Sequence, residues 1–222
     1  MKHRFRPTRR AIDDLITVMA ALRSPQGCPW DREQDHRTLR YHAVEEVYEL
    51  LDAIESGDDH EMAEELGDLL LQVVFHCQLG RERSAFDFDR VARHIVDKLV
   101  RRHPHVFGDS NAKTVDAVWT QWEIIKRAEK QGTRHARASA LDGIPRHLPA
   151  LLRAEKLLKK ARKAKLLPAA KNRTRSKPRA ILARELFALA AQAQAKGWSA
   201  EELLRAEVKR QECALRRRER AK

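Results

Sequence analysis

The chain has 222 residues, enough for one sizeable hydrophobic core or for one domain with an appendage. No apolar run is long enough to predict a membrane span, and Asp13 and Asp14 interrupt the place where a signal peptide would have its apolar core. Cys28, Cys77 and Cys213 lack C-x-x-C spacing, which predicts free thiols in a reducing cytoplasm.

The positive charge is concentrated in the C-terminal third of the chain. Residues 151–222 contain 22 Lys or Arg against 7 Asp or Glu, whereas residues 1–150 contain 23 against 25, so the net charge of +13 comes from the tail. Such a tail could bind nucleic acid or another polyanion. It could equally be the solvated surface of basic helices, and both interpretations stay open.

The apolar spacing along the chain predicts an all-α fold, in the form of a helical bundle, because strand signals are almost absent. A polar linker is expected at residues 132–142 and a low-complexity basic stretch at residues 168–178. Ser199 and Glu202 form a capping box before the last helix. The expected helices cover residues 9–23, 38–55, 59–79, 87–102, 114–130, 148–167, 179–196 and 200–218.

Two acidic motifs on consecutive helices are the main chemical signal. Residues three apart share a helix face, so a hairpin of these helices could bring four carboxylates together. Such a group repels itself unless a cation lies within it, and all-oxygen ligands favour Mg²⁺, with Mn²⁺ as a substitute, over zinc. The predicted metal ligands are Glu46, Glu49, Glu65 and Asp68.

The second acidic helix strengthens this prediction. Its residues 69–75 are apolar nearly all round, which predicts burial, yet a polar stripe runs along the helix as far as Gln72. Acids that enter a buried helix need a partner, and a metal is the simplest one. Gly67 within the helix costs about 1 kcal/mol relative to Ala and predicts a close backbone approach.

A metal held in this way could bind and neutralise a phosphate chain and activate a water molecule. Lys98, Arg101 and Arg102, near the end of one helix, could contact the phosphates, although cations at a helix C-terminus also favour the helix dipole. Glu45 or Glu64 could accept the proton of the attacking water.

Tryptophan side chains could stack on a nucleotide base. Trp119 and Trp122 lie at core spacing, so at least one of them is expected to pack inside the fold. His103 and His105 flank a proline, which is more typical of a structural loop than of metal ligands.

Six ordered segments carry a resemblance to a known family. They are Gly-Cys-Pro-Trp-Asp at 27–31, Glu-Glu-Val-Tyr-Glu at 45–49, Glu-Glu-Leu-Gly-Asp-Leu-Leu at 64–70, the run at 98–107, Trp-Glu-Ile-Ile-Lys at 122–126 and Ala-Leu-Asp-Gly-Ile-Pro at 140–145. Over about residues 9–165 the chain resembles the MazG family of nucleoside triphosphate pyrophosphohydrolases, within the all-α NTP pyrophosphatase superfamily.

The resemblance implies Mg²⁺-dependent hydrolysis of a nucleoside triphosphate to the monophosphate and pyrophosphate. It places Mg²⁺ at the four carboxylates, and Trp122 near the nucleotide. It implies phosphate contacts from Lys98 and Arg102, with Arg101 and Lys126 as further candidates. It also implies a homodimer or higher homo-oligomer whose site is shaped by both subunits, and a role in cleansing the nucleotide pool. Some members of the family also affect the alarmone ppGpp.

The resemblance also suggests how the chain is divided. Residues 1–135 correspond to a catalytic helical domain, and residues 136–222 to a shortened second MazG-like domain with a basic surface. In that second domain Ile181 and Arg184 stand where the Glu and Asp of the metal motif would be.

Two other functions stay open from the sequence. The first is a non-catalytic, dimeric helical module whose basic tail binds nucleic acid or a protein. The second is an oxygen-using di-metal carboxylate bundle, which is disfavoured because the E-x-x-H ligand pattern is missing from the two acidic helices. The preferred base and sugar are not readable from the sequence, since one or two pocket side chains decide them.

Overall fold

The computed structural model describes residues 8, 10–129, 131–133, 138–167 and 177–221, and over these residues it contains helices, turns and loops but no strand. The all-α prediction is therefore confirmed. The chain forms two compact units, Met1–Trp119 and Thr120–Lys222, each of which is described by itself. Most of the predicted low-complexity stretch, residues 168–176, and part of the predicted linker, residues 134–137, lie outside the described residues.

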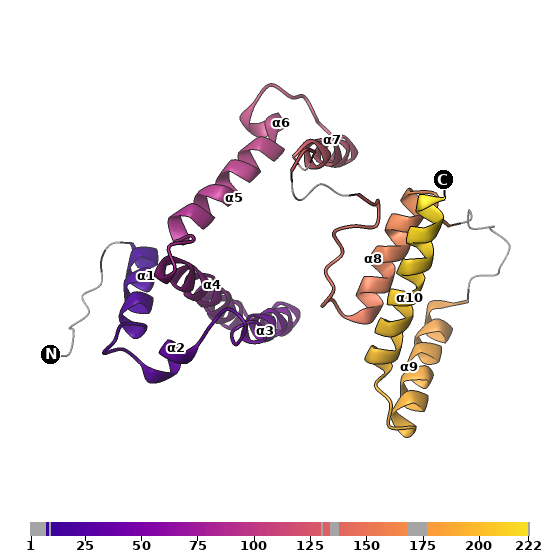
Figure 1. Cartoon of the computed structure of the whole chain (residues 1–222), viewed down its shortest axis with the longest axis horizontal. Coiled ribbons are helices and arrows are strands. Elements are labelled where there is room, and N and C mark those ends of the chain that lie inside the picture. Colours follow the sequence, from indigo (N-terminus) through magenta and orange to yellow (C-terminus); the bar gives the residue numbers. More distant parts are fainter. Residues whose placement is uncertain (1–7, 9, 130, 134–137, 168–176, 222) are drawn as a thin grey trace. The chain divides into compact units, whose positions relative to one another are not determined.

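The first unit is built from short and long helices (Figure 1). Two short helices were not predicted, and each begins at a proline, whose fixed φ suits the first helical position. The helices are α1 (Ala11–Leu22), α2 (Pro29–Glu33), α3 (His42–Ser56), α4 (Asp59–Glu82), α5 (Phe88–Arg102), α6 (Pro104–Phe107) and the beginning of α7 (Val115–Ala128).

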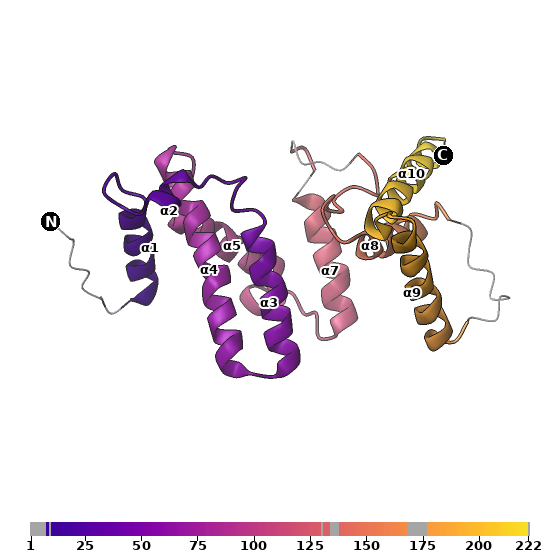
Figure 2. The same ribbon diagram turned by 90° about the horizontal axis from the view of Figure 1, so that it is seen from below.

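A two-residue connection turns α3 and α4 into an antiparallel hairpin, which Figure 2 shows side-on. Gly57 ends α3 with φ of 73°, a left-handed conformation that glycine adopts without a Cβ penalty. Asp58 then caps α4, because its side chain accepts hydrogen bonds from the backbone N–H of His60 at 2.8 Å and of Glu61 at 3.3 Å. The local sequence thus fixes where the two acidic helices face each other.

The core of the first unit lies on one side of α4. It consists of buried residues from α1, the α2–α3 connection and the second half of α4, namely Met19, Leu39, Val74, Phe75 and Leu79. The predicted burial of residues 69–75 is correct for Val74 and Phe75, whereas Leu70 and Val73 remain 40% and 39% exposed. The predicted close approach at Gly67 is wrong, since a Cβ there would meet nothing within 4 Å.

The apolar face of α3 has no cover within the described chain. The acidic side of α3 faces α4, so the opposite side is turned outward. Its five large residues are each 41% to 52% exposed. We call them the α3 stripe: Val44, Val47, Tyr48, Leu51 and Ile54.

The second unit pairs two long helices around a separate core. It contains the rest of α7, then α8 (Ala150–Lys163), α9 (Arg179–Ala195) and α10 (Ala200–Arg220). One half of the predicted capping box is confirmed, since the backbone N–H of Glu202 donates to the Ser199 hydroxyl at 3.2 Å. The buried core residues are Leu141, Leu157, Ala161, Leu166, Val208 and Leu215.

The structure also bears on two further expectations, those about membrane-spanning helices and free cysteines. None of the described helices is long and apolar enough to cross a bilayer. The three cysteines are free, as their spacing predicted, with Cys77 buried and Cys213 exposed.

Candidate metal centre

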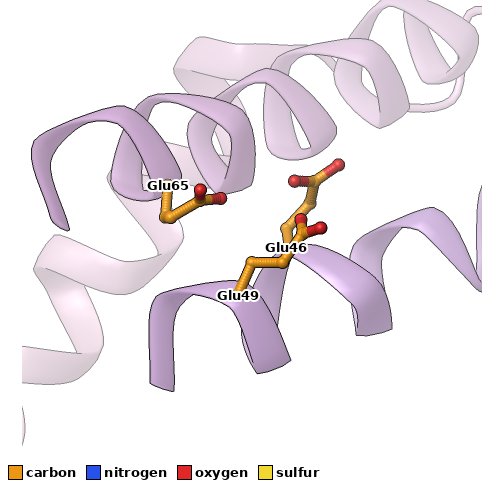
Figure 3. A group of neighbouring side chains, drawn as sticks. All are labelled: Glu46, Glu49 and Glu65. Atoms are coloured by element: carbon orange, nitrogen blue, oxygen red, sulfur yellow. The ribbon is translucent and has the colours of Figure 1, made fainter. Parts of the chain in front are cut away.

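Three carboxylates from the two helices of the hairpin converge on one point. Glu46 and Glu49 lie on α3 and Glu65 lies on α4, and one oxygen of each falls within 4.8 Å of the others. Figure 3 shows these side chains in the space between the two helices. The convergence follows from the sequence, because residues three apart share a face and the short turn sets that face against α4.

Asp68, the fourth predicted ligand, lies beside this group but is not one of the three converging residues. It is half-buried one turn after Glu65, and its charge raises the pKa of both Glu46 and Glu65. The structure therefore brings Asp68 into the electrostatic field of the other three. A metal–oxygen contact for Asp68 stays a prediction.

Burial and neighbouring negative charges raise the pKa of two of the three converging carboxylates, Glu46 and Glu65. Burial is the main cause that raises the pKa of Glu46, followed by the charge of Asp68, while a hydrogen bond from Gln72 acts in the opposite direction. Loss of hydration is also the main cause that raises the pKa of Glu65, followed by the charges of Glu49 and Asp68. A cation bound here would relieve this repulsion and would compete with protons.

The donor set fits a hard divalent cation. All three donors are carboxylate oxygens, without histidine or cysteine, which favours Mg²⁺ or Mn²⁺ over softer metals. Two oxygens on opposite sides of one Mg²⁺ lie about 4.2 Å apart, given metal–oxygen distances of about 2.1 Å. Small rotations of the Glu side chains would bring a group with a 4.8 Å span into that range.

The two candidate bases lie outside the converging group. Glu45 is exposed on α3, with a carboxylate oxygen 3.7 Å from Nδ1 of His42 on the same helix. Glu64 is exposed on α4, and its charge contributes to raising the pKa of its neighbour Glu65. Both residues are next to a predicted ligand in the sequence, and their role as the base stays a prediction.

The candidate substrate-binding cations lie on other helices. Lys98, Arg101 and Arg102 belong to the last part of α5, which runs away from the α3–α4 hairpin in Figure 1. Trp122 and Lys126 belong to the second unit, where Lys126 Nζ lies 5.5 Å from the centre of the Trp122 ring in a cation–π arrangement. Three of the four predicted metal ligands thus converge on one point, and the roles of the predicted substrate-binding residues stay predictions.

One polar residue at the centre was not predicted to have a role. Gln72 is buried, and its Nε2 donates to Oε1 of Glu46 at 3.3 Å. Its place on the acidic stripe of α4 was the only sequence signal for this contact, since it lies one helical turn after Asp68.

Comparison with known proteins assigns this region to a known domain family. Residues 34–107 match the model of the MazG nucleotide pyrophosphohydrolase domain. The match includes the four predicted metal ligands and the three cations of α5, whereas Trp122 and Lys126 lie beyond it.

Individual relatives are similar to this chain over a longer stretch than the family model. A nucleoside triphosphate pyrophosphohydrolase of Escherichia coli (strain K12) is 51% identical over 150 residues, which are 67% of this chain and 56% of that protein. The nucleoside triphosphate pyrophosphohydrolase/pyrophosphatase MazG of Thermotoga maritima is 46% identical over 150 residues, 68% of this chain and 56% of that protein.

A third relative is more distant. A nucleoside triphosphate pyrophosphohydrolase of Mycobacterium tuberculosis is 41% identical over 155 residues, 69% of this chain and 45% of that protein. The chain thus spans about half the length of the curated relatives it matches.

Proposed function

This chain belongs to the MazG family, and on that premise we propose that it hydrolyses nucleoside triphosphates to nucleoside monophosphates and pyrophosphate. The observation that carries the proposal is the convergence of Glu46, Glu49 and Glu65 to within 4.8 Å in a site made only of oxygen donors. With Asp68 they would hold Mg²⁺. A bound cation supplies charge neutralisation for the phosphate chain and a lowered pKa for a water molecule.

The protein's own residues then have separate tasks. The cations of α5, Lys98, Arg101 and Arg102, bind the phosphates that depart as pyrophosphate. Trp122 stacks on the base and Lys126 adds charge beside it. Glu45 or Glu64 accepts the proton of the attacking water. The biological role that we propose is the removal of unwanted triphosphates from the nucleotide pool.

The direct test is pyrophosphate release from a panel of ribo- and deoxynucleoside triphosphates, standard and modified, with Mg²⁺ and with excess chelator. We expect release that depends on Mg²⁺, with the monophosphate as co-product. Absence of release from every nucleotide by folded protein would contradict the proposal. The ranking of the panel would identify the preferred base and sugar.

We propose that the α3 stripe packs against a second copy of the chain. The stripe lies on the outer side of a site helix, and its five half-exposed large apolar residues form one continuous face of the kind that often marks a protein–protein contact. The site would then be shaped by both subunits.

Replacing Leu51 and Ile54 together with Lys is expected to convert a dimer into a monomer, because two charges would have to be buried at the contact. Light scattering after gel filtration should give twice 25.6 kDa for the wild type and 25.6 kDa for the variant. Asp52→Lys, which changes the charge of the same helix beside the stripe, should stay dimeric. A dimeric double variant would show that the contact lies elsewhere.

A second candidate function, nucleic-acid binding by the second unit, is favoured by the arrangement of its helix ends. Lys160 in α8 donates to the backbone oxygen of Ala140 at 3.3 Å, and Glu219 in α10 accepts from the N–H of Ala140 at 2.8 Å, so the two helix ends flank one residue. This basic end combines six cations from two helices: Lys160, Arg162, Lys163, Arg217, Arg218 and Arg220. Clustered cations of this kind fit a phosphate backbone.

Substitution tests this better than deletion, because α10 supplies Val208 and Leu215 to the core of the unit. Changing Arg217, Arg218 and Arg220 to Gln should weaken binding to a short DNA duplex. It should also lower the slope of log K against log salt by about 2.7, at about 0.9 per phosphate. The matched variant, with Lys at the same three positions, should keep most of the DNA affinity and most of the salt dependence. Equal anisotropy titrations for all three proteins would contradict nucleic-acid binding at this end.

A further inference from the structure

Gln72 is a buried polar residue whose hydrogen bonding is only half satisfied. Its side chain lies on the buried part of α4, and the residue is 8% exposed. Nε2 donates to Oε1 of Glu46 at 3.3 Å, whereas Oε1 of Gln72 is buried without a hydrogen-bond partner among the described residues. Buried polar atoms are nearly always paired, so this acceptor needs an explanation.

The orientation of the Gln72 amide is set by Glu46. A carboxylate can only accept hydrogen bonds when it is ionised, so the NH₂ group must face it. Rotating the amide by 180° would place two oxygens against each other and would leave Nε2 as the buried atom without a partner. The unpaired Oε1 is therefore the consequence of donating to Glu46.

Stability alone does not account for glutamine at this position. An apolar side chain of similar length would fill the same space without burying an unpaired acceptor. What an apolar side chain could not do is hold the carboxylate of Glu46. That carboxylate is one of the three that converge, and the hydrogen bond from Gln72 ties it to a buried residue of α4.

We propose that Gln72 is a positioning residue for the cation site, an inference that rests on the proposed function. Its amide fixes one side-chain conformation of Glu46 and keeps the carboxylate turned toward Glu49 and Glu65. The ligand is then ordered before the cation arrives, so binding does not have to order it. Partners behind a metal ligand typically change metal affinity 10- to 100-fold when they are removed.

Gln72→Met in the full chain tests this role, with two readouts. The affinity for Mn²⁺, used as a paramagnetic probe in EPR titrations, should fall about 10-fold. The melting temperature in excess chelator should stay the same or rise, because the buried unpaired oxygen is gone.

A matched control is available on the same helix. Gln78 also donates through Nε2 to a glutamate, Glu82, at 3.0 Å, but that glutamate is not part of the cation site. Gln78→Met should leave Mn²⁺ affinity unchanged. The comparison separates the loss of an amide–carboxylate hydrogen bond as such from its loss at the cation site.

The outcomes distinguish this inference from the proposed function. Wild-type protein that binds no Mn²⁺ would overturn both. Wild-type binding with equal affinity in Gln72→Met would overturn only the positioning role. A melting temperature in chelator that falls by several degrees would also overturn it, because Gln72 would then act through the packing of α4.

Discussion

Glu46→Gln is expected to abolish Mg²⁺-dependent pyrophosphate release while the helical fold stays intact, and Asp68→Asn should do the same. We expect a loss of at least about 100-fold, because a ligand is closer to the chemistry than the outer partners whose removal costs up to about 100-fold. The cation-free Glu46→Gln protein should also melt at a higher temperature. The substitution removes a charge that burial and Asp68 both disfavour.

The stabilisation of the cation-free protein by Glu46→Gln should depend on pH. The folded-state pKa of Glu46 lies above its ordinary value of 4.5, so ionisation costs folding free energy as pH rises from 4.5 through the folded-state pKa. Below 4.5 both proteins carry a neutral side chain at this position. The stability advantage of Glu46→Gln should therefore be present at neutral pH and vanish in acid.

The measurements are pyrophosphate release, circular dichroism and melting curves with and without Mg²⁺. Mg²⁺ should raise the melting temperature of the wild type and have little effect on Glu46→Gln. Asp52→Asn, an exposed carboxylate on the same helix that is outside the converging group, is the control and should behave as wild type. Normal turnover in both Glu46→Gln and Asp68→Asn would refute the assigned site.

Arg23→Met is expected to destabilise the first unit by about 2 kcal/mol, because it removes the charged hydrogen bonds of a buried guanidinium to Glu82, whose side chain is 35% exposed. The Arg23 side chain is 9% exposed and binds Glu82 with two hydrogen bonds of 2.6 and 2.7 Å. Its remaining nitrogen donates to the backbone oxygens of Asp31 and Gln34. One guanidinium thus joins the end of α1 to the α2 segment and to α4.

The stability of the first unit in acid should also depend on the Arg23–Glu82 pair. The hydrogen bond from Arg23 is the main cause that lowers the pKa of Glu82 from 4.5. A lowered carboxyl pKa contributes stability that is fully present above pH 4.5 and is lost as pH falls through the folded-state value. This part of the acid sensitivity should disappear in Arg23→Met.

Urea denaturation at neutral pH and through the acid range would measure both effects. Arg32→Met is the matched control, because Arg32 is exposed in the same region and makes a hydrogen bond of 3.1 Å to the Pro25 backbone oxygen. Its cost should be under about 1 kcal/mol. Equal costs for Arg23→Met and Arg32→Met would show that the first unit does not depend on the Arg23–Glu82 pair.

The helices were predictable because their signals are local. The start of α4 at Asp59, of α9 at Arg179 and of α10 at Ala200 agrees with the prediction, since caps, prolines and a 3.6-residue apolar period lie within a few residues of each boundary. The short α2 and α6 were missed, because four or five residues show no period. The prediction at Gly67 failed because a glycine by itself does not reveal its neighbours.

The sequence by itself determined the all-α fold and predicted four acidic side chains on facing sides of one hairpin, of which three converge in the structure, because spacing and a two-residue turn leave few alternatives. Only the tertiary structure decided that the α3 stripe is turned outward and that Gln72 meets Glu46. It also decided that Arg23 meets Glu82, 59 residues away along the chain. Such contacts depend on which helices pack together, and packing is set by surfaces far apart in sequence rather than by any local pattern.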